Sequence, residues 1–259
     1  MSNFLKEATE ARKAVLLMVY KAGTSHIASN FSIIDVATVL YKNLKPQDEV
    51  VWSKGWAAAT IYYFLAQQGK IPKEDLAKFP NPPYLGLAET TVPGVLVSGG
   101  SMGHGLPIAV GMALGKKLAN EEGIIFCIMS DGELNEGTTW ESAALAKHHK
   151  LDNLVVLIDN NGWQAMGKTK EVLDYEPIEN KWTGFGWWYE RGSGHDYSFL
   201  EKRLLQNPIK DMPTVIICDT TKGKGVSFME NYLIFHYKHI EKNEYEKAMA
   251  ELNRTLANV

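Results

Sequence analysis

The sequence predicts an α/β protein in which a parallel sheet is flanked by helices on both faces. Three short apolar runs indicate the sheet, namely Ile124–Met129, Leu154–Ile158 and Val215–Cys218. Runs of this length without alternating polar residues are typical of strands that are covered on both sides. A helical segment, Gly137–His149, separates the first two runs. This arrangement gives a strand, helix, strand unit whose crossover should be right-handed.

Helices are expected before the first of these strands. Apolar residues recur at helical spacing in Phe4–Lys21 and Phe31–Asn43. Segments 55–69 and 103–119 are rich in alanine and other small residues, which allows helices to pack closely on a sheet. The proline-rich segment 79–87 cannot continue a helix and should form an irregular loop.

A charged helix is expected at the end of the chain, over 239–257. The 259 residues are 45% hydrophobic and 22% charged, which is ordinary for a globular protein with a full core. No internal repeat, low-complexity tract or linker divides the sequence. Residues 1–259 are therefore expected to form a single domain.

Charge and apolar patterning argue against two classes of partner. The net charge is −3 with both signs interleaved, which leaves no basic face for nucleic acid. No apolar stretch approaches the roughly 20 residues of a membrane span, and the charged amino terminus does not resemble a signal peptide. Cys127 and Cys218 lie in apolar runs, so they should be buried thiols rather than a disulfide. These features favour small-molecule chemistry in the cytoplasm.

Polar residues follow the predicted strands. Asp131, Asp159 and Asp219 each end one of the three apolar runs, and ligands of parallel sheets collect beyond this edge. Asp131 and Asn161 follow neighbouring strands, which would bring their oxygens to a common point. Such oxygens suit Mg²⁺ or Ca²⁺, and Gly132 would let the backbone approach a diphosphate. A lone aspartate at a strand end is otherwise most often a cap or turn residue.

The pair of Asp131 and Asn161 resembles the thiamine diphosphate signature, in which a GDG element is followed one strand later by asparagine. Ser130 replaces the first glycine of that element with another small residue. The resemblance implies the diphosphate-binding fold of thiamine enzymes. It also implies that Asp131, Asn161 and the backbone carbonyl of Trp163 hold a divalent metal, Mg²⁺ or else Ca²⁺ or Mn²⁺.

Four further segments are similar to transketolases, particularly to the separate amino-terminal subunits of split transketolases. They are 22–27 (AGTSHI), 51–57 (VWSKGWA), 93–106 (PGVLVSGGSMGHGL) and 221–231 (TKGKGVSFMEN). The matches run in order from about residue 14 to residue 236. The resemblance implies cofactor contacts at a set of residues in these motifs: Trp56, Ser101, Met102, Gly103, Asp131, Gly132, Glu133, Asn161 and Lys222.

The same resemblance implies catalytic roles for two histidines and two glutamates. His26 falls on the histidine that binds substrate and transfers protons, although outside the motif it would be an ordinary loop histidine. His236 lies near the last family histidine but lacks the glycine that follows it. Glu136 and Glu141 match acids that face the subunit interface and relay protons, and would otherwise be a cap acid and a surface acid.

Two positions depart from the family pattern on the donor side of the substrate site. Trp56 stands where transketolases have the histidine of the SKGHA segment, and Gly86 stands where they have the histidine of an HPE motif. An indole retains one N–H donor but transfers no proton, and a glycine leaves space. Trp56 is also compatible with a purely packed aromatic. The departures argue against ordinary pentose phosphates as substrates rather than against cofactor binding.

The resemblance implies that half of the active site lies on another chain. In transketolases the glutamate that activates the cofactor belongs to a pyrimidine-binding domain, which does not follow the last helix here. A separate carboxyl-terminal subunit with that domain is expected, in a heterotetramer that transfers a two-carbon ketol unit from a ketose-type donor to an aldehyde-type acceptor. Sugar phosphates are the expected class of substrate.

Two other functions remain open from the sequence. Asn160-Asn161 and the missing donor histidines also suit the alpha subunit of a 2-oxo-acid dehydrogenase or an acyl-transferring relative. A non-catalytic cofactor-binding assembly subunit is the third possibility. The motif containing His26 and the segment 221–231 favour transketolase, and retention of Asp131, Asn161 and Glu136 argues against an inactive subunit.

Overall fold

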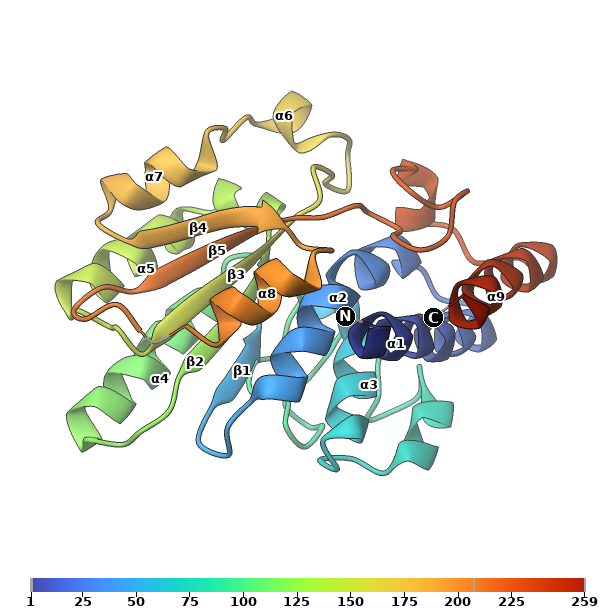
Figure 1. The fold of residues 1–259 in the computed structure, drawn as a ribbon, viewed down its shortest axis with the longest axis horizontal. Helices are drawn as coiled ribbons and strands as arrows, with labels where there is room; N and C mark the ends of the chain where they lie inside the picture. The colour runs from blue at the N-terminus through green and yellow to red at the C-terminus, as the bar shows by residue number, and fades with distance from the viewer. Residues whose placement is uncertain (1, 207, 259) are drawn as a thin grey trace.

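The computed structural model describes residues 2–206 and 208–258, which contain a five-stranded parallel sheet (Figure 1). The strands are β1 (Glu49–Trp52), β2 (Ile125–Ser130), β3 (Leu154–Asn160), β4 (Trp188–Ser193) and β5 (Thr214–Asp219), in the order β1-β2-β3-β5-β4. The register aligns Ser130 with Asp159 and Asn160 with Asp219. The polar strand ends therefore lie along one edge of the sheet.

Helices cover both faces of this sheet, as the sequence predicts. The layer on one face contains α2 (Ile27–Asn43), α3 (Ala58–Gln67) and α8 (Tyr197–Leu204). Outside this layer, α1 (Ser2–Ala22) packs on α2 and α3, and α9 (Lys242–Ala257) packs on α1. The layer on the other face contains α4 (Gly105–Ala119), α5 (Gly137–His148) and α7 (Ile178–Gly184). Successive strand residues point to opposite faces, so Phe126 and Ile128 pack into the first layer while Ile125 and Cys127 pack into the second.

Short helical turns complete the connections at both edges of the sheet. They are α6 (Thr169–Val172), η1 (Gly55–Ala57), η2 (Lys73–Lys78), η3 (Asp131–Asn135) and η4 (Leu233–His236). Three of them, η1, η3 and η4, contribute residues to the cavity described below.

The three predicted strands, the helix between the first two and the irregular loop over 79–87 are confirmed. The predicted helix over 31–43 begins earlier, at Ile27, and the one over 55–69 becomes α-helical only at Ala58. Strands β1 and β4 were not predicted from the sequence. Both lack a long apolar run, because β1 has only four residues and β4 (WYERGS) is a largely exposed edge strand.

The described residues, 2–206 and 208–258, include no helix that is long and apolar enough to span a bilayer. Cys127 and Cys218 are free and buried, as their apolar surroundings predict. Their strands belong to the centre of the sheet, where both faces are covered.

Two loops meet backbone to backbone where the chain leaves β1. A Cβ atom added to Gly55 would lie 2.5 Å from the Cα atom of Gly99, closer than such atoms can approach. Ala88 bridges the same two residues, since its amide donates to the Gly55 carbonyl at 3.3 Å and its carbonyl accepts from the Gly99 amide at 2.9 Å. This contact fixes Trp56, whose indole Nε1 donates to the Gly100 carbonyl at 3.3 Å.

The close approach predicts that Gly55→Ala destabilises the protein by about 1–3 kcal/mol, because the methyl group forces two backbones apart. Urea unfolding followed by circular dichroism measures the change. Gly86→Ala is the matched control, since no atom lies within 4 Å of a Cβ placed at Gly86. Equal stability of the two variants would contradict the proposed packing.

Candidate functional site

A cavity of about 430 Å³ lies beyond the carboxyl ends of β1, β2 and β3. Many of the site residues predicted from the sequence line it: His26, Trp56, Met102, Asp131, Gly132, Glu133, Asn161, Trp163 and His236. Others are outside its lining: Ser101, Gly103, Glu136, Glu141 and Lys222. The fold therefore brings together residues from segments that are far apart in the sequence.

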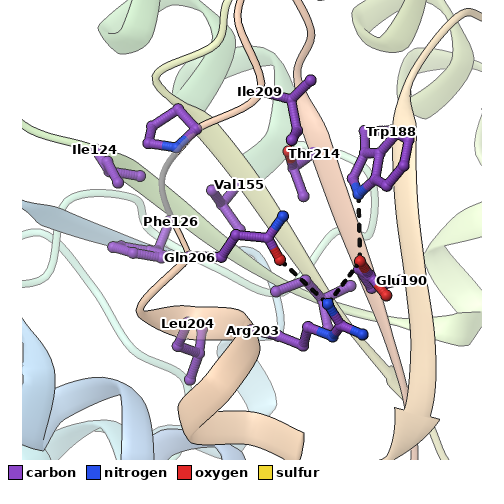
Figure 2. A pocket seen from close by; sticks show the side chains of 12 residues that line it. Ile124, Phe126, Val155, Trp188, Glu190, Arg203, Leu204, Gln206, Ile209 and Thr214 are labelled. Carbon is purple, nitrogen blue, oxygen red and sulfur yellow. Dashed lines mark hydrogen bonds and ion pairs between the residues drawn. The ribbon is translucent and has the colours of Figure 1, made fainter.

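The opposite edge of the sheet includes a small hollow and, beside it, a wider and more open pocket lined by Gln47, Glu122 and Asp152 among others. Side chains at the amino ends of the strands line the hollow, among them Ile124, Val155 and Thr214 (Figure 2). Its volume is about 20 Å³, which leaves room for about one water molecule. Arg203 pairs with Glu190 at 3.0 Å across it. A ligand of cofactor size fits the cavity at the carboxyl edge and not this hollow.

Asp131 begins the turn after β2 and is 1% exposed. Its Oδ2 accepts hydrogen bonds from the Gly162 amide at 2.9 Å and the Thr169 hydroxyl at 2.7 Å, whereas its Oδ1 accepts one from the Gly132 amide at 3.0 Å. Each carboxylate oxygen offers about two lone pairs, so Oδ1 retains one. Burial raises the pKa of Asp131 to about 6, and the negative charge of Asp159 acts in the same direction.

Asn161 and Trp163 supply two more oxygens with unused lone pairs. The Asn161 Nδ2 donates to Asp159 at 3.2 Å and its Oδ1 accepts from the Trp163 amide at 3.0 Å, which fixes the orientation of the carboxamide. No described residue donates to the Trp163 carbonyl. One carboxylate, one amide and one peptide oxygen on the same cavity match the hard ligands of Mg²⁺. The donor set therefore fits a divalent metal.

Clusters of the usual charged and sulfur-containing metal ligands are absent elsewhere in the described part of the chain. Within the described ranges, no group of three or more histidine, cysteine, aspartate and glutamate side chains could hold an ion. The oxygen set at the cavity contains a single carboxylate, so further negative oxygens would have to come from a ligand.

The buried carboxylate of Asp159 joins four segments of the chain. It accepts hydrogen bonds from Ser32 of α2 at 2.6 Å, from Lys54 and Thr220, and from Asn161. Burial alone would favour the neutral acid, but the Lys54 ammonium and the hydrogen bonds hold the pKa of Asp159 below its ordinary value. The pair is shielded from water, because the side chain of Asp159 is completely buried and that of Lys54 is 7% exposed.

A cluster of rings forms another wall of the cavity. The rings of His26 and Trp56 stack with their centroids 4.5 Å apart, and the ring of His236 lies 4.6 Å from His26. The backbone of His26 is left-handed, with φ of 68°, and its amide donates to the His236 carbonyl at 3.1 Å. Burial and the charge of Lys222 lower the pKa of His26 to about 4 and that of His236 to about 3. Both imidazoles are neutral at pH 7.

Lys222 lies behind this cluster and is 1% exposed. Its ammonium is 2.8 Å from Nδ1 of His236, and no carboxylate of a described residue lies within ion-pair distance of it. Burial and the charge of Lys54 lower the pKa of Lys222 to about 8. Because Lys222 lies behind the histidines and not on the cavity lining, its charge would attract an anion in the cavity from a distance.

Glu133 lines the cavity but uses its carboxylate to hold the chain together. Oε2 accepts from the Ser53 hydroxyl and from the Gly103 amide at 3.1 Å, and Oε1 accepts from the Ser130 amide at 2.9 Å. These bonds join the turn after β2 to the loop that carries Met102. The Met102 side chain is 41% exposed beside Gly132.

Glu136 and Glu141 lie on α5, away from the cavity lining. Glu136 is half-buried at the residue that precedes the helix, and Glu141 is exposed. Glu136 also packs next to Gly103, where a Cβ atom would lie 2.7 Å from the Glu136 Cβ. The positions leave both carboxylates free for contacts with another chain.

Sequence reasoning missed three residues that shape the site, Ser32, Lys54 and Thr169. The signal for Lys54 was its place in the segment 51–57, which is similar to transketolases, directly before Gly55. The signal for Ser32 was a polar residue inside a predicted apolar helix. Thr169 lies far along an irregular loop, and nothing in the sequence pattern indicates that its hydroxyl reaches Asp131.

Comparisons with known proteins show similarity to one family. Residues 6–253 match the family model described as transketolase, thiamine diphosphate binding domain. An apulose-4-phosphate transketolase subunit of Actinobacillus succinogenes is 34% identical over 93% of this chain and 92% of that protein. The 6-deoxy-6-sulfo-D-fructose transketolase subunit SqwG of a Clostridium species is 33% identical over 96% of this chain and 95% of that protein.

A solved structure extends the likeness to three dimensions. The transketolase of Campylobacter jejuni superposes with a TM-score of 0.90 at 28% identity, covering 97% of this chain and 43% of that enzyme. The chain thus corresponds to less than half of that transketolase.

The buried ion pair predicts that Asp159→Ala destabilises the fold by about 3–5 kcal/mol, because the Lys54 ammonium is left buried without its partner. Chemical denaturation of the purified chain measures the loss. Glu246→Ala, which removes an exposed pair with Lys242, is the control and should leave stability almost unchanged. An Asp159→Ala variant as stable as this control would show that water reaches Lys54.

Proposed function

Because the chain belongs to the transketolase family, we propose that it binds thiamine diphosphate with a divalent metal as one subunit of a two-subunit ketol transferase. The observation that supports this most directly is the set of three oxygens with unused lone pairs on one cavity. In the proposal Asp131, Asn161 and the Trp163 carbonyl hold Mg²⁺, with Ca²⁺ or Mn²⁺ as substitutes. Residues 1–259 act as a single diphosphate-binding domain.

The residues around this metal suit a diphosphate. A Cβ atom placed at Gly132 would touch Gln164 at 3.4 Å, so the missing side chain of this glycine keeps the space beside Asp131 unfilled. Lys222 supplies a buried positive charge with no ion-pair partner among the described residues, although the carboxylates of Asp131 and Asp159 attract it from a distance. Metal and lysine together would neutralise the diphosphate at the rim of the sheet. Ser101, Met102 and Gly103 would bound the site through the loop that Glu133 anchors.

Bound thiamine diphosphate supplies the carbanion chemistry, and the protein binds and orients the reactants. The ammonium of Lys222 donates to Nδ1 of His236, so the proton of this neutral imidazole lies on Nε2. His26 is also neutral, and its Nδ1 is 2.7 Å from the Ser25 hydroxyl. We assign to the two imidazoles the exchange of protons with substrate hydroxyl groups, for which neutral rings are suited.

The donor substrate is proposed to differ from the common ketose phosphates. Trp56 stacks on His26, so an indole occupies the wall where transketolases have an imidazole. The space around Gly86 is open. The names of relatives in Actinobacillus succinogenes and Clostridium point to apulose 4-phosphate and 6-deoxy-6-sulfo-D-fructose. These names support a non-standard ketose-type donor, with an aldehyde-type acceptor.

A separate partner subunit is proposed to complete the site. The relatives whose names describe them as transketolase subunits match this chain over nearly their whole length, which supports a partner with the pyrimidine-binding domain. Ile108 of α4 and Leu145 of α5 are 42% and 47% exposed, and no atom lies within 4 Å of a Cβ placed at Gly111. This apolar, open surface suits a contact with another chain, in a heterotetramer in which Glu136 and Glu141 relay protons.

The remaining parts of the proposal concern location and alternatives. Two buried, free thiols suit a reducing cytoplasm. The alternatives, a 2-oxo-acid dehydrogenase component or a non-catalytic assembly component, gain no support from the geometry. The site retains its oxygen ligands, its buried lysine and both imidazoles.

The metal assignment predicts that Asp131→Ala lowers the affinity for thiamine diphosphate in the presence of Mg²⁺ by about 100-fold or more, because the single carboxylate of the metal site is lost. Isothermal titration of the complex with its partner subunit measures this. Asp174→Ala, at an exposed aspartate outside the cavity lining, is the control. Unchanged affinity in the Asp131 variant would refute the metal assignment.

Trp56 and Gly86, which replace two histidines of the family, predict a low catalytic efficiency with xylulose 5-phosphate as the donor. Replacing both by histidine should raise kcat/KM for xylulose 5-phosphate by about tenfold or more, because two lost hydrogen-bonding partners of the donor are restored. Steady-state kinetics of the assembled enzyme measures the ratio, and thiamine diphosphate affinity checks that the site is intact. A native enzyme that already uses xylulose 5-phosphate as efficiently as ordinary transketolases would contradict the altered-donor proposal.

A further inference from the structure

The loop that follows Asn161 is closed at its base by a single carboxylate oxygen. The Gly162 amide and the Thr169 hydroxyl both donate to Oδ2 of Asp131, at 2.9 Å and 2.7 Å. The two ends are also joined directly, because the Thr169 amide donates to the Gly162 carbonyl at 3.0 Å. Asp131 therefore fastens both ends of segment 162–169, which we call the metal loop.

The interior of the metal loop is a small hairpin. Trp163 and Lys168 pair as antiparallel neighbours, and the Gln164 amide donates to the Gly167 carbonyl at 2.8 Å. Gly162 adopts a left-handed φ of 74°, which favours glycine. The hairpin carries the Trp163 carbonyl, so the position of this oxygen relative to Asp131 depends on the closure at Gly162 and Thr169.

The two carboxylate oxygens of Asp131 therefore differ in the number of hydrogen bonds that they accept. The bonds from Gly162 and Thr169 use both lone pairs of Oδ2, while Oδ1 accepts one bond, from Gly132. We propose that Thr169 is a positioning residue that closes the metal loop on Oδ2 and thereby presents Oδ1 of Asp131 and the Trp163 carbonyl to the metal. This inference rests on the proposed function, since it concerns the same metal site.

The hydroxyl of Thr169 is well placed for such a role. Its bond to a carboxylate that is 1% exposed is charge-assisted, and such bonds are about twice as strong as neutral ones. Without it, Oδ2 retains one donor, like Oδ1, so the carboxylate is no longer held in one orientation. Groups that orient metal ligands in this way typically contribute about 10- to 100-fold to metal affinity.

The test compares Thr169→Val, which keeps the shape of the side chain, with Thr169→Ser, which keeps the hydroxyl. Thr255→Val is the control. It removes the hydrogen bond from the Thr255 hydroxyl to the Glu251 carbonyl in α9, which is distant from Thr169 in the sequence. Hydrogen exchange of the metal-free chain should show faster exchange within 162–169 in Thr169→Val alone. The complex with the partner subunit is then titrated with Mn²⁺ in the presence of thiamine diphosphate. Thr169→Val should bind Mn²⁺ about 10- to 100-fold more weakly than the native complex, and Thr169→Ser should bind it almost as tightly as the native complex.

The outcomes separate this inference from the proposed function. If the native complex binds no Mn²⁺ with thiamine diphosphate, the proposed function fails and the inference fails with it. If the native complex binds both and Thr169→Val binds them equally well, only the role of Thr169 is overturned. Loss of affinity in Thr169→Ser equal to that in Thr169→Val would also overturn it, because the hydroxyl would not be the determining group. Far-UV circular dichroism of each variant checks that the fold is retained.

Discussion

The site depends on a buried carboxylate at the end of the central strand. Asp159 accepts hydrogen bonds from Ser32 in α2 and from Lys54, which follows β1. It also accepts them from Thr220, which follows β5, and from Asn161, which precedes the metal loop. A buried carboxylate requires such partners, because an unpaired charge away from water is very costly. The hydrogen bonds and the ion pair of this one carboxylate thus hold four segments together at one edge of the sheet.

Some of the charged side chains around the cavity have an ion-pair partner, and others do not. Lys54 forms an ion pair with Asp159, whereas the buried ammonium of Lys222 is hydrogen-bonded to the neutral ring of His236 and has no ion-pair partner among the described residues. Asp131 has hydrogen bonds but no cation in contact, and burial raises its pKa. A metal beside Asp131 and an anion beside Lys222 would balance both groups. A metal diphosphate supplies these two charges together.

The fold could be predicted from the sequence wherever a strand is covered on both faces, as at Ile124–Met129. The short strand β1 and the exposed edge strand β4 could not, because their residues carry no long apolar run. The placement of Asp131 and Asn161 on one cavity was predictable, since the strand ends of a parallel sheet converge. The roles of Thr169 and Lys54 were not, because their partners lie far away in the sequence and are set by tertiary packing.

In the proposed site the oxygens of Asp131, Asn161 and Trp163 share one divalent metal. Anomalous diffraction from crystals of the complex with its partner subunit, grown with Mn²⁺ and thiamine diphosphate, would locate this metal. A Mn²⁺ peak is expected in contact with Oδ1 of Asp131, Oδ1 of Asn161 and the Trp163 carbonyl. Bound thiamine diphosphate with no Mn²⁺ at these three oxygens, or with Mn²⁺ held elsewhere, would contradict the proposed site.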